Sequence, residues 1–258
     1  MSKFVPVSRE LFESKFWKRN PDYAFAGKDS VAPLVLQELS KVCLSLPIAF
    51  IKNEAGFTPV AVQSFEASRN LLVAENGKWI GRYIPAVYRG YPFALATAGE
   101  NQQVLCVDEE YPLINDEEGE SFFNEDGPSQ VLKDVLSFLD QVRVNRDVTM
   151  KACQSIEAAD LFVPWDITIK SDTGDQNLAG LFRIDESKFI KLSIEGLDKI
   201  RNSGGLPVIY SHLLSVQHLQ SLGALARQLN SLVKPDATNV DELFGESDDT
   251  LKFDFENI

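Results

Sequence analysis

Residues 47–65 read PIAFIKNEAGFTPVAVQSF, and this stretch decides the fold class. Two apolar runs, 47–52 and 57–65, flank the short segment NEAG. Runs rich in Val, Ile and Phe that are separated by a few residues including glycine are typical of a β-hairpin. The pattern therefore predicts two antiparallel strands, with Gly56 in the turn.

Two more hairpins are predicted further along the chain. The segments 91–97 and 103–109 are joined by AGEN, and the segments 161–170 and 177–185 flank SDTGDQ. Apolar residues occupy both faces of the 103–109 segment, which is typical of a covered strand. We expect the three hairpins to form one mainly antiparallel sheet.

Helical periodicity accounts for most of the remaining chain. Apolar residues recur at helical spacing over residues 30–44, 128–158 and 206–233, and shorter helical patterns lie at 8–16 and 186–202. Helices that flank an antiparallel sheet define the α+β class. We therefore expect a single α+β domain over residues 1–234, in which a mainly antiparallel sheet is flanked by helices.

The last segment, residues 235–258, has a different composition. It holds eight acidic residues and one lysine, so its net charge is −7. Segments of low hydrophobicity and high charge are typically disordered. Leu251, Phe253 and Phe255 alternate with charged residues, which leaves an edge strand or a docking motif as the alternative.

Composition excludes several classes of partner. The chain of 258 residues carries a net charge of −13, which does not favour nucleic acid or an anionic membrane surface. No uncharged apolar run approaches the roughly 18 residues of a transmembrane helix, so membrane insertion is not expected. The N-terminus has no signal-peptide pattern, so we expect a cytoplasmic protein. The alternative is a protein that is exported without an N-terminal signal peptide.

Three cysteines, Cys43, Cys106 and Cys153, are far apart in the sequence. An odd number of scattered cysteines in a long chain suggests buried, reduced thiols. A Cys–His nucleophile would require folding to bring one of them to His212 or His218.

No known catalytic or cofactor motif is present in the sequence. It contains no G-x-G-x-x-G, P-loop, G-x-S-x-G or H-E-x-x-H pattern, and the acidic residues 116–126 lack the spacing of a calcium loop. His212 and His218 would point about 120° apart on a helix, so they do not form a metal pair. We therefore expect no cofactor, no metal and no catalytic residues.

The most distinctive segment is GKWIGRYIPAVYRGYPFALA, residues 77–96, here called the aromatic–arginine stretch. Pro85 suits the first turn of a short helix and Gly90 its end. A helix over 82–89 would place Arg82 and Arg89 on one face, whereas an extended chain would place them on opposite faces. Two guanidinium groups on one face can bind carboxylates or phosphates.

Two interpretations of this stretch remain open. In the first, it binds a protein or an anionic small molecule through Trp79, Arg82, Tyr83, Tyr88, Arg89 and Tyr91. In the second, the rings belong to the core and the arginines pair with the protein's own acids. The acidic segment 108–126 and the acidic tail are the internal candidates for that pairing.

Several segments resemble the bacterial SapC family, which is distinct from the peptide-transport permease of similar name. They are PLVLQEL (33–39), LPIAFIK (46–52), NLLVAENGKWIGRYIPAVYRGYPFAL (70–95), FFNEDGPS (122–129), VPW (163–165), LAGLFRIDESKF (178–189) and RNSGGLPVIYSHLLSVQHLQSL (201–222). The resemblance implies no established catalytic residue or cofactor. It suggests a link to a surface layer, or an accessory role beside outer-membrane uptake or peptide-modification systems.

Three functions are therefore compared. The first is a non-catalytic binding or accessory protein that uses the aromatic–arginine stretch. The second is an enzyme acting on an anionic small molecule or peptide, with a site drawn from Arg82, Tyr83, Tyr88, Arg89, Tyr210 and His212. The third is a structural component of a surface layer. The oligomeric state is left open.

Overall fold

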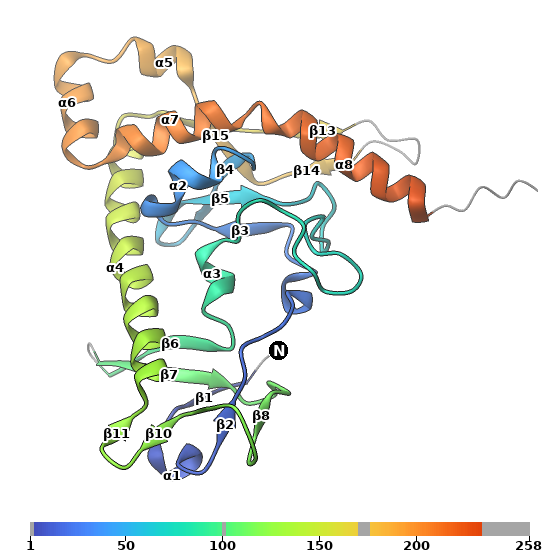
Figure 1. Ribbon diagram of the computed structural model, residues 1–258. Helices are drawn as coiled ribbons and strands as arrows, with labels where there is room; N and C mark the ends of the chain where they lie inside the picture. The colour runs from blue at the N-terminus through green and yellow to red at the C-terminus, as the bar shows by residue number, and fades with distance from the viewer. Residues whose placement is uncertain (1–2, 100–101, 170–175, 234–258) are drawn as a thin grey trace, which may run out of the picture.

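The computed structural model describes residues 3–99, 102–169 and 176–233, and it has the α+β architecture that the sequence predicts (Figure 1). Every strand pair in the described chain is antiparallel. Two larger sheets lie one above the other in this view, and the longest helix runs beside both.

The larger sheet has five strands. In spatial order they are β12 (Phe162–Pro164), β15 (Leu181–Ile184), β4 (Ile48–Asn53), β5 (Gly56–Val62) and β3 (Val31–Pro33). The β4–β5 register runs from Ile48 opposite Ala61 to Asn53 opposite Gly56, which confirms the predicted hairpin. Gly56 has a φ of +113°, a conformation that glycine adopts at little cost.

The hairpin predicted at 91–109 forms a separate sheet, so the expectation of one sheet built from three hairpins was wrong. Its strands are β6 (Phe93–Ala98) and β7 (Gln102–Asp108), and the third strand is β1 (Phe4–Pro6). The N-terminal strand pairs with β7, with Val5 opposite Val107. A hairpin turn specifies the pairing of its own two strands. Which strand pairs with the outer edge of each is instead determined by contacts between residues far apart in the sequence.

Four short pairings complete the strands. They involve β2 (Phe16–Trp17), β8 (Ile114–Asn115), β9 (Glu120–Ser121), β10 (Phe123–Asn124), β11 (Gly127–Pro128), β13 (Ile167–Ile169) and β14 (Gln176–Leu178). Strand β2 lies between β8 and β9 and so attaches the N-terminal segment to the acidic segment 108–126. The strand pair predicted at 161–185 is divided, since β12 pairs with β15 and β13 pairs with β14.

One helix, α4 (Gln130–Ala158), runs along one side of the molecule beside both larger sheets in Figure 1. The predicted pattern at 128–158 allowed either one long helix or two, and the structure shows one. Ser129 caps its N-terminus, because the Ser129 hydroxyl accepts a hydrogen bond from the Leu132 N–H at 3.2 Å. Helix α4 packs against β5 in one sheet and β6 in the other.

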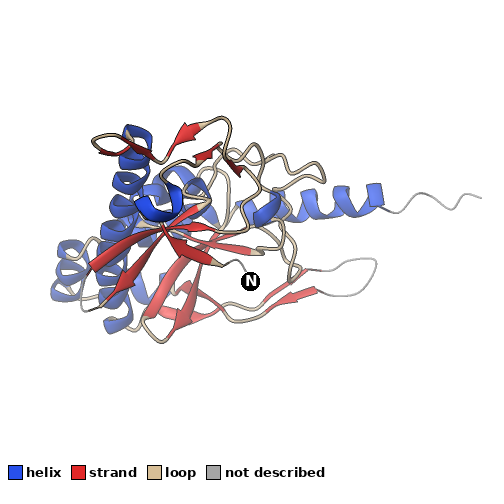
Figure 2. Cartoon of the chain, turned by 90° about the horizontal axis from the view of Figure 1, so that it is seen from below, coloured by secondary structure: helices blue, strands red, loops and turns tan. Residues whose placement is uncertain are grey.

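The remaining helical segments are shorter than α4, and several are shorter than the sequence predicts. They are α1 (Arg9–Phe12), η1 (Ala24–Ala26), α2 (Leu36–Val42), α3 (Ala86–Arg89), α5 (Glu186–Ile190), α6 (Ile194–Asn202), α7 (Gly205–Ser215) and α8 (His218–Val233). The helix predicted at 30–44 loses its first residues to β3, where Pro33 lies in an edge strand that tolerates proline. The helix predicted at 206–233 is two helices, α7 and α8; the second extends away from the sheets toward the C-terminal end (Figure 2).

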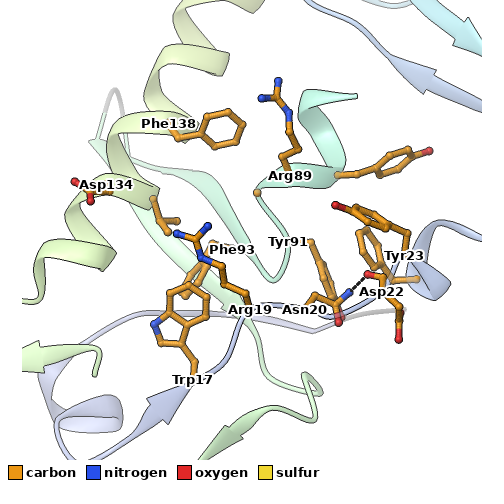
Figure 3. Close-up of a pocket in the computed structure, with 14 residues that line it drawn as sticks. Trp17, Arg19, Asn20, Asp22, Tyr23, Arg89, Tyr91, Phe93, Asp134 and Phe138 are labelled. Atoms are coloured by element: carbon orange, nitrogen blue, oxygen red, sulfur yellow. Dashed lines mark hydrogen bonds between the residues drawn. The ribbon is translucent and has the colours of Figure 1, made fainter. Parts of the chain in front are cut away.

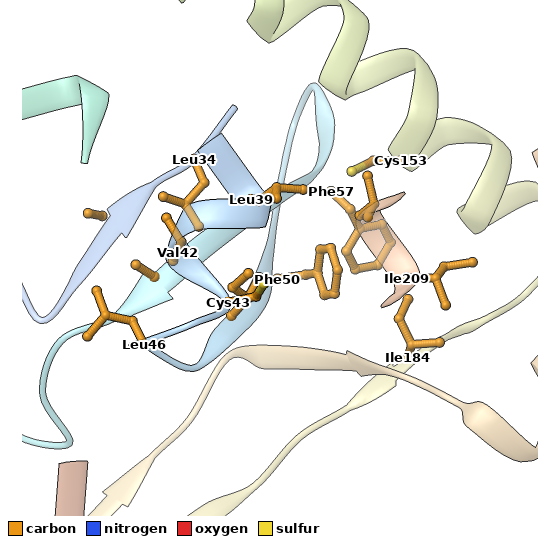
Figure 4. Packing of buried hydrophobic residues seen from close by; sticks show 14 of the residues in the cluster. Leu34, Leu39, Val42, Cys43, Leu46, Phe50, Phe57, Cys153, Ile184 and Ile209 are labelled. Atoms are coloured by element: carbon orange, nitrogen blue, oxygen red, sulfur yellow. The ribbon is translucent and has the colours of Figure 1, made fainter. Parts of the chain in front are cut away.

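The buried apolar side chains form three clusters. The first packs Phe50, Phe57 and Ile209 between the five-stranded sheet and its helices (Figure 4). The second covers the other part of that sheet, and the third surrounds Trp17 and Phe122 beside the β1–β7–β6 sheet. Helix α4 contributes residues to the first and third clusters, so it joins the two sheets through buried contacts.

All three cysteines are buried and free, as the sequence predicts. Burial raises the pKa of the Cys153 thiol to about 12, with the nearby Glu157 carboxylate as the smaller cause. His218 contacts the backbone oxygen of Cys43, at 3.0 Å, rather than its thiol. Among the described residues, no helix combines the length and the apolar character needed to cross a membrane.

Candidate functional site

The aromatic–arginine stretch runs from the five-stranded sheet to the β1–β7–β6 sheet, and α3 lies at its centre (Figure 1). The sequence left a helical or an extended chain open over 82–89, and the structure has a helix only over the second half, Ala86–Arg89. Pro85 has ψ of 145° and precedes α3, while Gly90 ends it as predicted. Arg82 therefore lies outside the helix and Arg89 at its last position. The two arginines nevertheless line the same hollow, because folding rather than helical spacing brings them together.

Two of the six predicted binding residues are mainly core residues. Trp79 and Tyr88 expose only 8% and 5% of their surface. Their ring centroids lie 5.7 Å apart, and Trp79 also packs against Tyr23 at 5.6 Å. The Tyr88 hydroxyl donates to the buried Gln63 Oε1 at 2.9 Å. For these two rings the core interpretation is the better description, although each has an edge on a hollow.

Tyr83 and Arg89 form a chain of polar contacts that begins at a buried carboxylate. The Tyr83 hydroxyl donates to Glu38 Oε2 at 3.0 Å, and Arg89 Nη2 donates to the Tyr83 oxygen at 3.3 Å. Burial and then the Glu38 charge raise the pKa of Tyr83 to about 12, although Arg89 opposes the shift. Tyr83 therefore stays protonated at neutral pH and positions the Arg89 guanidinium.

Arg82, Arg89 and Lys78 share one hollow, which we call the cationic hollow. Its volume is about 430 Å³, and its lining residues are Pro21, Tyr23, Lys78, Trp79, Gly81, Arg82, Tyr83, Ile84 and Arg89. None of these nine residues is acidic. Within residues 3–99, 102–169 and 176–233, none of the three cations forms an ion pair. The hollow is therefore a local concentration of positive charge.

A second hollow, the junction cleft, adjoins the first where the N-terminal segment, α3 and α4 meet (Figure 3). Its volume is about 410 Å³, and it is lined by Trp17, Arg19, Asn20, Asp22, Tyr23, Phe25, Tyr88, Arg89, Gly90, Tyr91, Phe93, Asp134, Val135 and Phe138. Tyr23 and Arg89 line both hollows. The Arg89 guanidinium lies over the Phe138 ring at 5.2 Å, a cation–π contact.

Tyr91 belongs to the wall of the junction cleft. Its ring stacks on Phe25 with centroids 4.0 Å apart, and its hydroxyl donates to Asp108 Oδ2 at 3.1 Å. Burial and this hydrogen bond raise the pKa of Tyr91 to about 12. The ring is held on two sides, so it offers a fixed flat surface to the cleft.

The cleft also contains residues that the sequence reasoning missed. Arg19, Tyr23 and Phe25 come from the segment WKRNPDYAFAG (17–27), and Phe138 comes from α4. The 17–27 segment has the same mixture of arginine, rings and proline as the aromatic–arginine stretch. This shared composition could have identified residues 17–27 as part of the site. Both segments contribute lining residues to the junction cleft.

The acidic segment 108–126 does not pair with the arginines, so this internal candidate was wrong. Its acids bind lysines of the N-terminal segment instead: Glu109 with Lys3 at 2.6 Å, Asp116 with Lys15 at 2.7 Å, and Glu118 with Lys18. The pairing of β2 with β8 and β9 brings Lys15 and Lys18 to their partners, and the pairing of β1 with β7 brings Lys3 to Glu109. The other candidate, the tail 235–258, lies outside the described residues.

The residues proposed for an enzyme do not meet in one site. His212 is buried; its Nδ1 donates to the Ile48 oxygen at 2.7 Å, and its Nε2 accepts from the Ile184 N–H at 3.2 Å. His212 lines a different hollow from the arginines, and Tyr210 packs on Phe189. His212 therefore has a structural role, since both of its ring nitrogens bind backbone groups.

Comparison with known proteins gives a family and no close relative. No curated protein matches the chain, and no solved structure matches it either. The SapC family model matches residues 7–222, a range that includes the aromatic–arginine stretch and the segment 17–27. The match covers most of the 258 residues, and the chain therefore belongs to the SapC family.

Proposed function

We propose that this protein is a non-catalytic binding protein that holds an anionic ligand at Arg82 and Arg89. The observation that carries the proposal is the cationic hollow. Lys78, Arg82 and Arg89 line it, and none of its nine lining residues is acidic, in a chain whose net charge is −13. Guanidinium groups bind carboxylates and phosphates with two parallel hydrogen bonds, so two arginines suit such a ligand.

The adjoining junction cleft suggests the other half of the ligand. Arg89 lies on the wall common to both hollows, and the rings of Phe25, Tyr91 and Phe138 line the cleft beside it. An anion held by Arg82 and Arg89 could carry a planar or apolar group into the cleft. Ligand sites in proteins are typically concave, mainly apolar and equipped with a few polar groups that orient the ligand.

A binding role fits the chemistry of the cationic hollow better than catalysis. None of the nine residues that line it is a carboxylic acid or a histidine. Its one hydrogen-bonded tyrosine, Tyr83, is engaged with Glu38 and stays protonated at neutral pH. General base catalysis needs a group that accepts a proton within hydrogen-bond reach of the substrate. An enzymatic function would therefore depend on Asp22 or Asp134 of the neighbouring cleft.

The biological setting is proposed from the family alone. We infer an accessory role beside surface-layer or outer-membrane uptake and modification systems, and the proposal for the site does not depend on it. Native mass spectrometry of the untagged protein would test for a co-purified ligand. Extra mass that is lost on denaturation would support binding.

A direct test uses phenyl phosphate, which combines an anion with a ring, and isothermal titration in a buffer without phosphate. We expect the Arg82→Gln/Arg89→Gln variant to bind phenyl phosphate at least about tenfold more weakly than the wild type. Arg143→Gln is the matched control, because Arg143 pairs with Asp140 at 2.8 Å on the surface of α4. Its affinity should equal that of the wild type.

Folding of each variant is checked by circular dichroism. If the double variant does not fold, the single Arg82→Gln variant replaces it, because Arg82 is exposed and forms no ion pair within the described part of the chain. A wild-type protein that does not bind phenyl phosphate, or an equal loss in the Arg143→Gln control, would overturn the proposal.

A further inference from the structure

A third cavity, of about 360 Å³, lies against α4 and the first residues of α3, and we call it the α3–α4 pocket. Its lining residues are Pro33, Leu34, Val35, Glu38, Ile51, Asn53, Ala55, Phe57, Thr58, Pro59, Ala86, Val87, Val142, Arg146, Thr149 and Met150. It shares no residue with the cationic hollow or the junction cleft. It is therefore a separate candidate site.

The walls of the α3–α4 pocket are mainly apolar. Helix α4 contributes Val142, Arg146, Thr149 and Met150, which share one helical face because they follow the spacing i, i+4, i+7 and i+8. A stripe with this spacing is usually apolar throughout, and Arg146 and Thr149 interrupt it. Val87 of α3 is 42% exposed, so an apolar surface remains open to an occupant.

The negative group of the pocket is Glu38, of which only 4% is exposed. Its Oε1 accepts from the Val35 N–H at 2.9 Å, and its Oε2 accepts from the Ala86 N–H at 2.8 Å and from the Tyr83 hydroxyl. A carboxylate offers about four acceptor positions, so Oε1 has room for one more donor. No cation among the described residues forms an ion pair with Glu38.

The positive group is Arg146, which is exposed and makes no ion pair in the described part of the chain. Its neighbour Arg143 differs, because it binds Asp140 at 2.8 Å and Asp147 at 3.7 Å. The remaining hydroxyl on the α4 wall is already engaged: Thr149 accepts from the Leu36 N–H at 2.8 Å and donates to the Asn145 oxygen at 2.6 Å. Glu38 and Arg146 are thus the two charged groups of an apolar pocket.

We propose that the α3–α4 pocket binds a small apolar α-amino acid. The ammonium group donates to Glu38, the carboxylate accepts from the Arg146 guanidinium, and the apolar side chain packs between Phe57, Ile51 and Val142. The pairing of opposite charges distinguishes this ligand from a simple carboxylic acid or a simple amine, each of which would leave one charged group without a partner. The proposal does not require the anion site to be correct, although Tyr83 connects Glu38 to Arg89 through hydrogen bonds.

Isothermal titration of the full-length protein tests this assignment with L-leucine, L-methionine and L-phenylalanine. Two analogues of leucine each lack one charge: 4-methylpentanoate has no amine, and 3-methylbutylamine has no carboxylate. We expect at least one of the amino acids to bind, and to bind about tenfold or more tightly than either analogue. Absence of binding by all three amino acids at millimolar concentration, or equal binding of an analogue, would overturn the proposal.

The matched variants are Arg146→Gln and Arg143→Gln, which remove the same charge from neighbouring positions of α4. Only Arg146→Gln should weaken amino-acid binding, by about tenfold or more. It should leave the binding of phenyl phosphate unchanged, and Arg82→Gln should leave amino-acid binding unchanged. These crossed measurements separate a failure of this proposal from a failure of the anion site. Equal losses in Arg146→Gln and Arg143→Gln would contradict the role of the pocket.

Discussion

At the scale of single residues, His212 shows how burial decides the role of a side chain. Its ring contacts Phe50 and Trp165 and binds two backbone groups, so it joins α7 to β4 and β15. Burial is the main cause that lowers the pKa of His212 to about 4, and the nearby Arg183 charge lowers it further, against the Ile48 hydrogen bond. The native ring is therefore neutral at physiological pH, with the proton on Nδ1.

This shift predicts a pH-dependent stability. Unfolded histidine has a pKa of about 6.5, so the unfolded chain binds a proton below that pH while native His212 does not until about pH 4. The contribution of His212 is complete above pH 6.5 and is lost as the pH falls toward 4. We expect the free energy of unfolding to decrease by about 2 kcal/mol from pH 7 to pH 5 through this group.

Urea unfolding at both pH values measures the change. Nitrogen NMR of the histidine rings identifies its source, because native His212 should remain neutral with Nδ1 protonated at pH 5. A His212 ring that is charged in the folded protein at pH 5 would contradict the prediction.

At the scale of elements, α4 lines both the junction cleft and the α3–α4 pocket. Its first half contributes Asp134 and Phe138 to the junction cleft, and its second half contributes Arg146 and Met150 to the α3–α4 pocket. The helix begins at a well-defined cap: Ser129 is buried, and its hydroxyl binds the Leu132 N–H. The position at which α4 begins therefore fixes the positions of the α4 residues that line the junction cleft and the α3–α4 pocket.

Removal of this cap should destabilise the protein. We expect Ser129→Ala to lower the free energy of unfolding by about 1 kcal/mol, because a buried N–H at the helix start loses its acceptor. Urea unfolding at pH 7 gives the measurement. Ser137→Ala is the control, because Ser137 is an exposed position within the same helix, and alanine is the better helix former there. Similar decreases in the free energy of unfolding in both variants would show that the Ser129 cap does not stabilise the protein more than an exposed serine of the same helix does.

At the scale of the whole molecule, three apolar clusters are tied together by elements that cross between them. Trp17 lies in the cluster beside the β1–β7–β6 sheet, Trp79 lies in the first cluster of the five-stranded sheet, and Trp165 packs against the second. Leu132 and Ile156, at opposite ends of α4, belong to different clusters. A continuous helix that is buried in two clusters should couple their unfolding.

The three tryptophans report on this coupling. We expect variants that retain one tryptophan each, with the other two replaced by phenylalanine, to show a fluorescence transition that coincides with their own circular dichroism transition in urea. Such coincidence would support one domain over residues 1–234. An earlier fluorescence transition in the variant that retains Trp17 would instead divide the chain into two cooperative units.

Much of the local structure could be predicted from the sequence. The β4–β5 hairpin follows from its two apolar runs and Gly56, the α4 helix from its periodicity and Ser129, and the end of α3 from Gly90. These features depend on interactions within a few residues. Of the two conformations left open for 82–89, neither holds throughout, because Pro85, with a ψ of 145°, keeps the chain extended directly before α3.

The sequence by itself determined the α+β class, the β4–β5 and β6–β7 hairpins, the buried thiols and the segment that holds Arg82 and Arg89. These features depend on local periodicity, turn residues and composition, which act over short distances along the chain. The tertiary structure alone decided that the 91–109 hairpin leaves the larger sheet, that Lys15 and Lys18 bind the acidic segment, and that residues 17–27 complete the junction cleft. It also decided that Glu38 and Arg146 face one pocket. These outcomes depend on contacts between residues far apart in the chain, and such contacts are selected by packing and charge in the folded protein rather than by neighbouring residues.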